Sequence, residues 1–356
     1  MPTFLETVRE RDRQHRKALA EWEALGQYLP GPIDPSVTSG LTICSVAFKG
    51  KACLEQNDRV LRALNPEGEE PRAWLLFDNN EQASERIDPG DSRFRVVRPN
   101  RRDVDMGYEH ALGLAALFPH IRTRFVLFLD PDCFIVLPNW VRSVIDHMKR
   151  HELGFFGTPI NPRRHNSYRY FPYVVCMFVD LARVPLRDLC FVPDVWEWKT
   201  SLTYRARKAL AGIPKLGILF RWLLTERWLT NGWRIKAKYG DGRLARHECV
   251  QGVWDINETI PPGTLRRVIH NLTPGSVSPI PKKAGYCSSI GFAALGAPDV
   301  SAKGWEEFVW QGRPFAFHLG SAHSKAIDRA ALDGIIDRFV ACGRAVAPEV
   351  PSQVSA

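Results

Sequence analysis

The sequence lacks the cysteine patterns that mark zinc-binding modules and disulfide-rich domains. Its eight cysteines are scattered along 356 residues, and no two of them form a Cys-x-x-Cys pair. Zinc modules show such closely spaced pairs, and disulfide frameworks show a dense set in a short chain. We therefore expect neither a zinc site nor a disulfide framework, and we interpret the cysteines within apolar runs as small core residues.

Long hydrophobic runs are also missing. No stretch reaches the roughly 18 apolar residues that a membrane-spanning helix needs, and the longest candidate, 216–224, is interrupted by Arg221. The first 16 residues are charged and contain no apolar centre, so we expect no signal peptide. These absences predict a cytoplasmic protein and leave open peripheral contact with the inner face of a membrane.

What the chain does contain is typical of a soluble globular protein with a basic surface. Hydrophobic residues make up 45% and charged residues 24%, enough for a sizeable core in one large domain or two smaller ones. Lys and Arg total 48 against 39 Asp and Glu, a net charge of +9. This balance favours an anionic partner such as a nucleotide, a phospholipid surface or nucleic acid, and does not choose among them.

Strand and helix patterns alternate through the first half of the chain. Strands are predicted at 41–48, 73–77, 94–97 and 125–129, and helices at 52–64, 81–87 and 106–118. This alternation predicts an α/β fold with a mostly parallel sheet flanked by crossover helices. A further amphipathic helix is expected at 3–25, a strand at 173–180 and a C-terminal helix at 326–342.

The strongest chemical signal follows the strand at 125–129. This run of five apolar residues leads directly into Asp130-Pro131-Asp132. Open α/β sheets bind ligands at the carboxyl ends of their strands, and two carboxylates there suit Mg²⁺ or Mn²⁺ carrying a phosphate rather than zinc. A second Asp-x-Asp at 103–105 lies in a polar loop, and we interpret it as solvated.

Other strand ends carry groups that suit a nucleotide. Residues 45–48, with Ser45, Val46 and Phe48, offer backbone amides and an aromatic ring to a base, and Asp78 with Asn79 offers acceptors to a base or ribose. Each of these residues alone is more often a cap or a turn residue. Because the carboxyl ends of parallel strands share one edge, together they favour a nucleotide site.

These features make residues 41–158 resemble the nucleotide-binding half of inverting GT-A glycosyltransferases, particularly family 2. The resemblance rests on the opening strand 42–46, the Asp78-Asn79-Asn80 run, the spacing of Asn100, Gly107, His110 and Gly113, and the 127–132 run followed by Pro138-Asn139-Trp140. His110 stands where Asn is common, and the loop after Asp78 lacks the usual Gly-Ser-Thr. The resemblance implies a nucleoside-diphosphate sugar and a divalent metal.

The resemblance also implies roles for residues later in the chain. An acid about 60 residues after the metal motif serves as the base that activates the acceptor hydroxyl, and Asp194 and Glu197 lie at that distance between tryptophans. A late His-x-Gly segment returns to the metal, which matches His318 as a third ligand. Ser324 and Lys325 would then contact phosphate oxygens. Tryptophan packing with exposed acids is the alternative for 191–198, and a structural histidine is the alternative for His318.

The expected organisation has four segments. These are an N-terminal helix and linker (1–40), a nucleotide-sugar-binding half (41–158), an acceptor-side half (159–325) and a C-terminal helix and tail (326–356). Residues 200–238 mix basic and apolar side chains, which suits a helical insertion meeting anionic lipid, a groove for a nucleic-acid or phosphorylated acceptor, or a plain surface helix. Residues 261–301 are rich in Pro, Gly and Ser and are expected to form a loop or lid.

The sequence therefore predicts a metal-dependent inverting glycosyltransferase, with a surface polysaccharide or lipid-linked glycan as the default acceptor. Three alternatives remain at this stage. A DNA glycosyltransferase acting on a hydroxylated base would bind duplex DNA with strong salt dependence. A sugar nucleotidyltransferase would carry an early Gly-rich signature with Arg and Lys, which this chain lacks. An inactive sugar-nucleotide-binding protein would bind the donor without hydrolysing it.

Overall fold

The computed structural model describes residues 4–29, 40–65, 72–98, 106–159, 171–193, 231–253, 291–320 and 329–345. A seven-stranded sheet forms its centre, with the order β3-β2-β1-β4-β7-β6-β8. The strands are β1 Leu41–Ala47, β2 Arg72–Asp78, β3 Arg95–Val97, β4 Phe125–Leu129, β6 Leu153–Gly157, β7 Cys176–Asp180 and β8 Arg246–Cys249. Only β7 is antiparallel to its neighbours, β4 and β6. The predicted α/β class with a mostly parallel sheet is confirmed.

A second, smaller sheet was not foreseen. It has the order β5-β11-β10-β9 and is antiparallel throughout. Its strands are β5 Cys133–Ile135, β9 Gln251–Val253, β10 Glu306–Trp310 and β11 Arg313–His318. Only three residues separate the end of β4 from the start of β5, so this sheet starts at the carboxyl edge of the main sheet.

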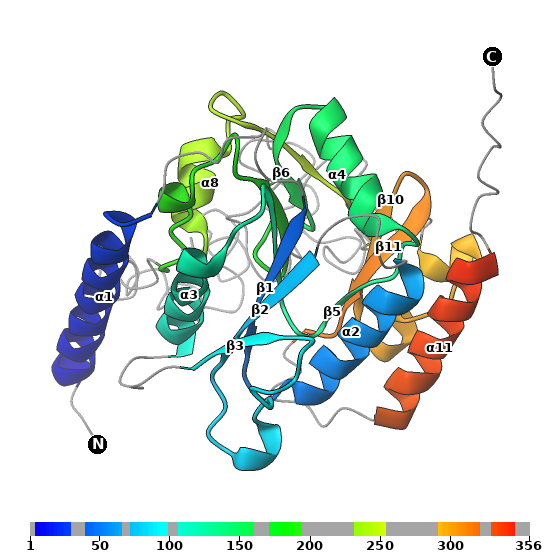
Figure 1. The fold of residues 1–356 in the computed structure, drawn as a ribbon, viewed down its shortest axis with the longest axis horizontal. Helices are drawn as coiled ribbons and strands as arrows, with labels where there is room; N and C mark the ends of the chain where they lie inside the picture. Colours follow the sequence, from blue (N-terminus) through cyan, green and yellow to red (C-terminus); the bar gives the residue numbers. More distant parts are fainter. Residues whose placement is uncertain are drawn as a thin grey trace, which may run out of the picture.

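Helices cover both faces of the main sheet (Figure 1). On one side lie α1 Phe4–Gly26, α3 Met106–Leu117 and α8 Trp233–Tyr239, and on the other lie α2 Lys51–Leu64, α4 Trp140–Arg150 and α11 Arg329–Ala345. Short 3₁₀ turns occur at Ala83–Glu85, Phe118–His120, Leu186–Asp188, Phe292–Leu295 and Ser301–Lys303. None of the described helices is long and apolar enough to cross a membrane.

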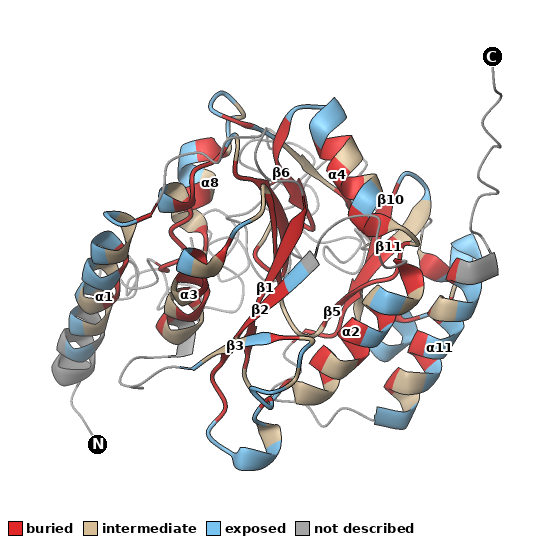
Figure 2. Cartoon of the chain, in the orientation of Figure 1, coloured by how far each residue is buried: buried red, intermediate tan, exposed pale blue. Residues whose placement is uncertain are grey.

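Strands β1, β4, β6 and β7 are buried along their whole length, as expected for apolar strands covered on both faces. Figure 2 shows β1 and β2 in the buried colour between the two helix layers. Side chains of alternate residues divide between the layers, since Cys44 and Phe128 pack on the α1/α3 side while Ile43 and Leu127 pack on the α2/α4 side. Five cysteines are buried free thiols, which confirms their interpretation as core residues: Cys44, Cys53, Cys133, Cys176 and Cys190.

One sequence prediction needs correction. The helix expected at 81–87 is only the single 3₁₀ turn Ala83–Glu85, because the Asp78 carboxylate accepts hydrogen bonds from the backbone N–H groups of Asn80 and Ile87 and holds the segment as a loop. The end of the expected lid, 291–301, packs into the core through Phe292 and Val300, which are both fully buried. The remainder of 261–301 lies outside the described residues.

The basic segment at 200–238 is described only from residue 231. There α8 directs Ile235 and Tyr239 into the core, and Tyr239 donates a hydrogen bond to Asp188 at 2.5 Å. The described end of this segment is therefore a short helix with one core face.

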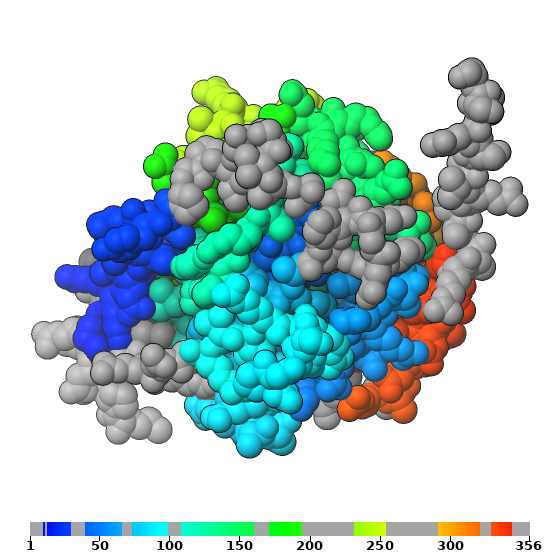
Figure 3. Space-filling view, in the orientation of Figure 1, coloured from blue at the N-terminus to red at the C-terminus, as the bar shows by residue number. Residues whose placement is uncertain are grey.

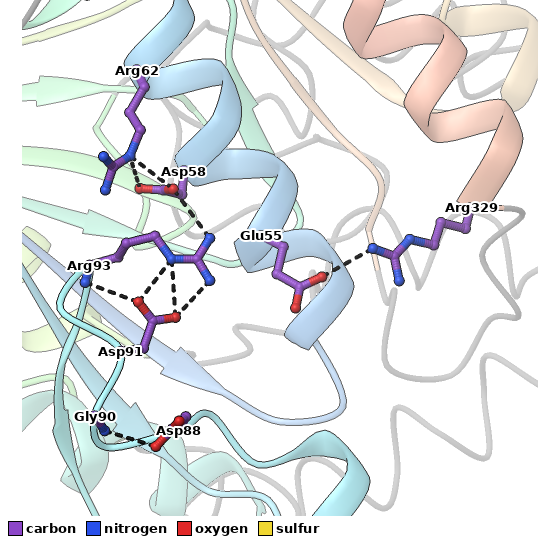
Figure 4. Close-up of polar contacts among 8 residues, drawn as sticks. All are labelled: Glu55, Asp58, Arg62, Asp88, Gly90, Asp91, Arg93 and Arg329. Atoms are coloured by element: carbon purple, nitrogen blue, oxygen red, sulfur yellow. Dashed lines mark hydrogen bonds and ion pairs between the residues drawn. The ribbon is translucent and has the colours of Figure 1, made fainter.

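Helix α2 is tied to the surrounding elements by ion pairs (Figure 4). Its Asp58 carboxylate, 9% exposed, accepts from Arg62 at 3.0 Å and from Arg93 at 3.4 Å, and Arg93 also pairs with Asp91. Glu55 pairs with Arg329 at the start of α11. These contacts fix α2 between the 88–94 loop and α11, and Figure 3 shows the 72–98 segment at the surface beside α2.

We expect Asp58→Asn to lower the free energy of unfolding by about 1–2 kcal/mol, because two arginines lose the charge of a nearly buried partner. Urea unfolding followed by circular dichroism measures the change. Asp337→Ala is the control, since its pair with Arg59 is half exposed on both sides and such pairs contribute less than about 1 kcal/mol. Equal effects of the two substitutions would contradict the structural role of Asp58.

Candidate functional site

The carboxyl ends of β1, β2 and β4 meet at one edge of the main sheet. Their parallel registers place Ala47 opposite Asp78 and Cys44 opposite Phe128. The loops that follow these strands are joined, because Asn79 N–H donates to the carbonyl of Ala47 at 2.8 Å. The predicted juxtaposition of the three strand ends is present.

Asp130, Asp132 and His318 converge at this edge. One oxygen or nitrogen atom from each of the three side chains lies within 4.8 Å of the others, and within the described residues no other group of acidic, histidine or cysteine side chains meets this condition. The Asp130 side chain is 26% exposed, whereas those of Asp132 and His318 are 13% and 8% exposed. The cluster is therefore most open to solvent on the side of Asp130.

The backbone of the 130–132 loop is fixed from two directions. Asn57, a buried residue of α2, donates its side-chain N–H to the carbonyl of Pro131 at 2.7 Å. From the second sheet, Leu319 N–H donates to the carbonyl of Asp132 at 3.0 Å. Because buried carbonyls rarely stay unsatisfied, these two bonds hold the loop in the conformation that presents both carboxylates.

The second sheet brings His318 to the cluster. His318 ends β11, where it lies opposite Cys133 of β5 and opposite Glu306 of β10. Its Nε2 is 3.3 Å from Asp132 Oδ1, and its Nδ1 is 2.7 Å from Glu306 Oε2. Burial lowers the pKa of His318, but the carboxylates of Asp132 and Glu306 outweigh it and raise the pKa well above the ordinary value of 6.5.

His110 lies on the open side of the cluster. This residue of α3 places Nε2 at 3.5 Å from Asp130 Oδ1, and its Nδ1 is 2.8 Å from the side-chain nitrogen of Asn231. Asn231 lies two residues before the start of α8, so His110 connects the acidic edge to a segment far along the chain.

Three residues that the sequence predicted to contact a nucleotide, Ser45, Val46 and Asp78, are buried inside the protein. Ser45 is fully buried and donates its hydroxyl to the carbonyl of Leu129 at 2.7 Å, while accepting from Trp74 Nε1. The Asp78 side chain is also fully buried, and Arg98 lies 3.2 Å from it. Val46 is buried in the core as well. These side chains support the edge of the sheet, and any contact with a base would come from the neighbouring backbone.

A cleft of about 330 Å³ opens beside these strand ends. The described residues that line it are Phe48, Lys49, Asn80, Glu81, Gln82, Glu85 and Glu109. Asn79 donates to Glu109 at 3.0 Å and so links the second strand end to α3. The cleft therefore combines a partly exposed aromatic ring with amide and carboxylate groups.

The remaining predicted residues lie outside the described part of the chain, namely Asn100, Asp194, Glu197, Ser324 and Lys325. Gly107 lies in the first turn of α3, at the carboxyl edge of the sheet.

Sequence reasoning missed Glu306 and Asn57, which hold the cluster without belonging to it. Asn57 gave no local signal, since it lies within an amphipathic helix. For Glu306 the Gln311-Gly312 turn is a partial signal, since both residues have the positive φ of a type I′ hairpin turn. A hairpin there places residues near 306 beside His318.

No protein-family model matches the chain, and no curated protein does. Solved structures with weak similarity include the mannosyltransferase PcManGT from Pyrobaculum calidifontis in complex with GDP-Man and Mn²⁺, at 12% identity and a TM-score of 0.29, covering 49% of this chain and 55% of that one. Residues 1–349 of S. aureus TarS in complex with UDP-GlcNAc match at 12% identity and a TM-score of 0.31, covering 43% of this chain and 48% of that one. The galactosyltransferase LgtC in complex with donor and acceptor sugar analogues matches at 11% identity and a TM-score of 0.31, covering 59% of this chain and 73% of that one.

The chain thus spans about half the length of the first two of these proteins. Similarity at this level does not transfer an activity or a substrate to the chain.

Proposed function

We propose that this chain is a metal-dependent glycosyltransferase that moves a sugar from a nucleoside-diphosphate sugar to a hydroxyl acceptor. The observation that supports this most is the convergence of Asp130, Asp132 and His318 at the carboxyl edge of a mostly parallel sheet. Ligands of open α/β sheets bind at this edge. The cleft beside Phe48 adds a site for a base next to the cluster.

The donor set of the cluster fits a divalent cation. Two carboxylates and one imidazole, with their ligand atoms within 4.8 Å of one another, suit Mn²⁺ and also permit Mg²⁺. Such an ion supplies charge that stabilises a departing diphosphate. His318 has to release a proton to act as a ligand, so metal binding is coupled to deprotonation of this residue.

The position of each residue suggests its role in binding the donor. The Phe48 ring, which lines the cleft, would stack on a base, while Gln82 and Glu109 would offer hydrogen-bonding groups to it. Asp130, the most exposed member of the cluster, would hold the cation on the side that is open to a donor. His110 orients the Asp130 carboxylate from the side of α3.

The finer parts of the proposal come from the family resemblance of the sequence. They are inversion at the anomeric carbon, Asp194 or Glu197 as the base that deprotonates the acceptor, and phosphate contacts from Ser324 and Lys325. The proposed acceptor is a surface polysaccharide or a lipid-linked glycan. A base positioned opposite the leaving diphosphate is what an inverting displacement requires.

Thermal unfolding in the presence of UDP-, GDP-, dTDP- and CMP-linked sugars, each with and without Mn²⁺, tests the proposal. A ligand at about 100 times its Kd stabilises the folded state by about 2.7 kcal/mol, which raises the Tm by several degrees. We expect one nucleotide series to produce this shift, and only when Mn²⁺ is present. If no nucleotide sugar raises the Tm with Mn²⁺, the proposal is wrong.

Slow hydrolysis of the stabilising nucleotide sugar, followed by release of the nucleoside diphosphate, separates an enzyme from a binding protein. We expect hydrolysis to require Mn²⁺ or Mg²⁺. Stabilisation without any hydrolysis or transfer would leave a sugar-nucleotide-binding protein in place of the glycosyltransferase.

A further inference from the structure

Glu306, His318 and Asp132 form a chain of three contacting side chains in which the histidine is the middle member. Nδ1 of His318 is 2.7 Å from Glu306 Oε2, and Nε2 is 3.3 Å from Asp132 Oδ1. All three side chains are between 8% and 13% exposed. The two nitrogens of one buried ring are thus committed to two different carboxylates.

A neutral imidazole carries one N–H, and the group that accepts from it decides which nitrogen remains as a metal ligand. The contact with Glu306 is the shorter of the two, so it favours the tautomer that carries the proton on Nδ1. The lone pair of Nε2 then points to the side of Asp132, where the proposed cation would bind. Carboxylate partners of this kind fix the ring and raise its basicity, and their loss typically weakens metal binding about 10- to 100-fold.

The fold keeps Glu306 in place opposite His318. The two residues are direct partners in the antiparallel β10–β11 pair, where side chains of opposite residues lie on the same face. The next residue, Glu307, faces the other way and accepts backbone N–H bonds from Phe292 at 2.8 Å and Ser301 at 3.0 Å. These bonds anchor β10, so that Glu306 cannot move along the strand.

We propose that Glu306 is the positioning residue of the metal site, which selects the tautomer and orientation of His318 without binding the cation itself. This inference rests on the metal site of the proposed function. It adds a residue that neither the acidic motif nor the late histidine segment contains.

The test compares Mn²⁺ affinity, measured by electron paramagnetic resonance of free Mn²⁺, in the full-length chain and its variants. We expect Glu306→Leu to weaken Mn²⁺ binding by about 100-fold. Glu306→Gln should weaken it by only about tenfold, because the amide oxygen can still accept a hydrogen bond from Nδ1–H. Glu152→Gln is the control, since it makes the same change in an exposed ion pair with Arg183, outside the cluster. Its Mn²⁺ affinity should equal that of the wild type.

A second readout separates positioning from general damage. Imidazole is a good ligand for Co²⁺ and Ni²⁺, whereas Mg²⁺ prefers carboxylates and depends little on an imidazole ligand. Glu306→Leu and His318→Ala should therefore both lower the affinity for Co²⁺ more than that for Mg²⁺, whereas damage to the fold would lower both affinities alike. In the His318→Ala background, Glu306→Leu should have no further effect on Mn²⁺ binding, because the residue it positions is gone.

The outcomes distinguish this inference from the proposed function. If His318→Ala weakens Mn²⁺ binding and both Glu306 variants bind like the wild type, the positioning role is wrong and the metal site stands. If Glu306→Leu does not fold, Glu306→Gln decides the question by the same measurement. A wild-type chain that binds Mn²⁺ but neither binds nor hydrolyses nucleotide sugars would overturn the glycosyltransferase and leave the role of Glu306 intact. A wild-type chain that binds no divalent cation would overturn both.

Discussion

Asp132→Asn is expected to preserve the fold and to reduce metal-dependent turnover of the nucleotide sugar by about 1,000-fold or more. Asparagine has nearly the same shape, and its backbone carbonyl still accepts from Leu319 N–H. The amide lacks the negative charge that holds a cation, however, and it faces His318 Nε2 at 3.3 Å in place of a carboxylate. A bound metal contributes several kcal/mol to stabilisation of the departing charge, and each 1.36 kcal/mol corresponds to a factor of ten in rate.

The measurement is Mn²⁺-dependent release of nucleoside diphosphate, with Tm and circular dichroism as checks of the fold. Asp105→Asn provides a matched control, because it makes the same change in the second Asp-x-Asp of the sequence, which we interpret as solvated. The control should retain wild-type turnover. Retained turnover in Asp132→Asn would count directly against a metal role for the 130–132 loop.

Asp180→Ala is expected to lower the free energy of unfolding by about 3–5 kcal/mol, because it leaves a mostly buried arginine without its partner. Asp180 ends β7 with a fully buried side chain, and its two oxygens accept from Arg124 at 2.9 and 2.7 Å. Ala182 N–H donates to the same carboxylate at 3.1 Å. The pair joins the ends of β4 and β7 at the edge opposite the proposed site.

Chemical denaturation gives the stability change, and Mn²⁺ binding by the fraction that remains folded should be unaffected. Asp146→Ala is the control, since its pair with Arg142 is exposed on both sides and separated by 3.7 Å. Such pairs contribute less than about 1 kcal/mol. A stability loss for Asp180→Ala no larger than that of the control would show that the Arg124 pair is not structural.

Local sequence patterns predicted five of the seven strands of the main sheet and missed β6 and β8. The strand at 125–129 has the predicted bounds, and β1 and α2 differ from their predicted ranges by one residue at an end. These patterns succeed because a strand buried on both faces must be a continuous apolar run, and an amphipathic helix must repeat about every 3.6 residues. The position of Asp130 and Asp132 at the carboxyl edge of the sheet follows from the same patterns.

The sequence failed where a polar contact decides the conformation. Residues 81–87 have enough polar and charged residues for a surface helix, but the buried Asp78 carboxylate competes for the backbone N–H groups of Asn80 and Ile87. That competition depends on how deeply Asp78 is buried, which no local pattern contains. The role of Asn57 was missed for a similar reason, since its hydrogen-bond partner, the carbonyl of Pro131, lies 74 residues away in the sequence.

By itself, the sequence determined the mostly parallel sheet and the acidic loop at its carboxyl edge, because both depend on apolar periodicity and on residues adjacent in the chain. Tertiary structure alone decided that Glu306 lies beside His318. The β10–β11 ladder shifts its register by one residue between Phe308 and Val309, opposite Pro314, which has no N–H to donate. Since a shift of one residue moves side chains to the other face of a strand, this bulge is the physical reason that Glu306 meets His318.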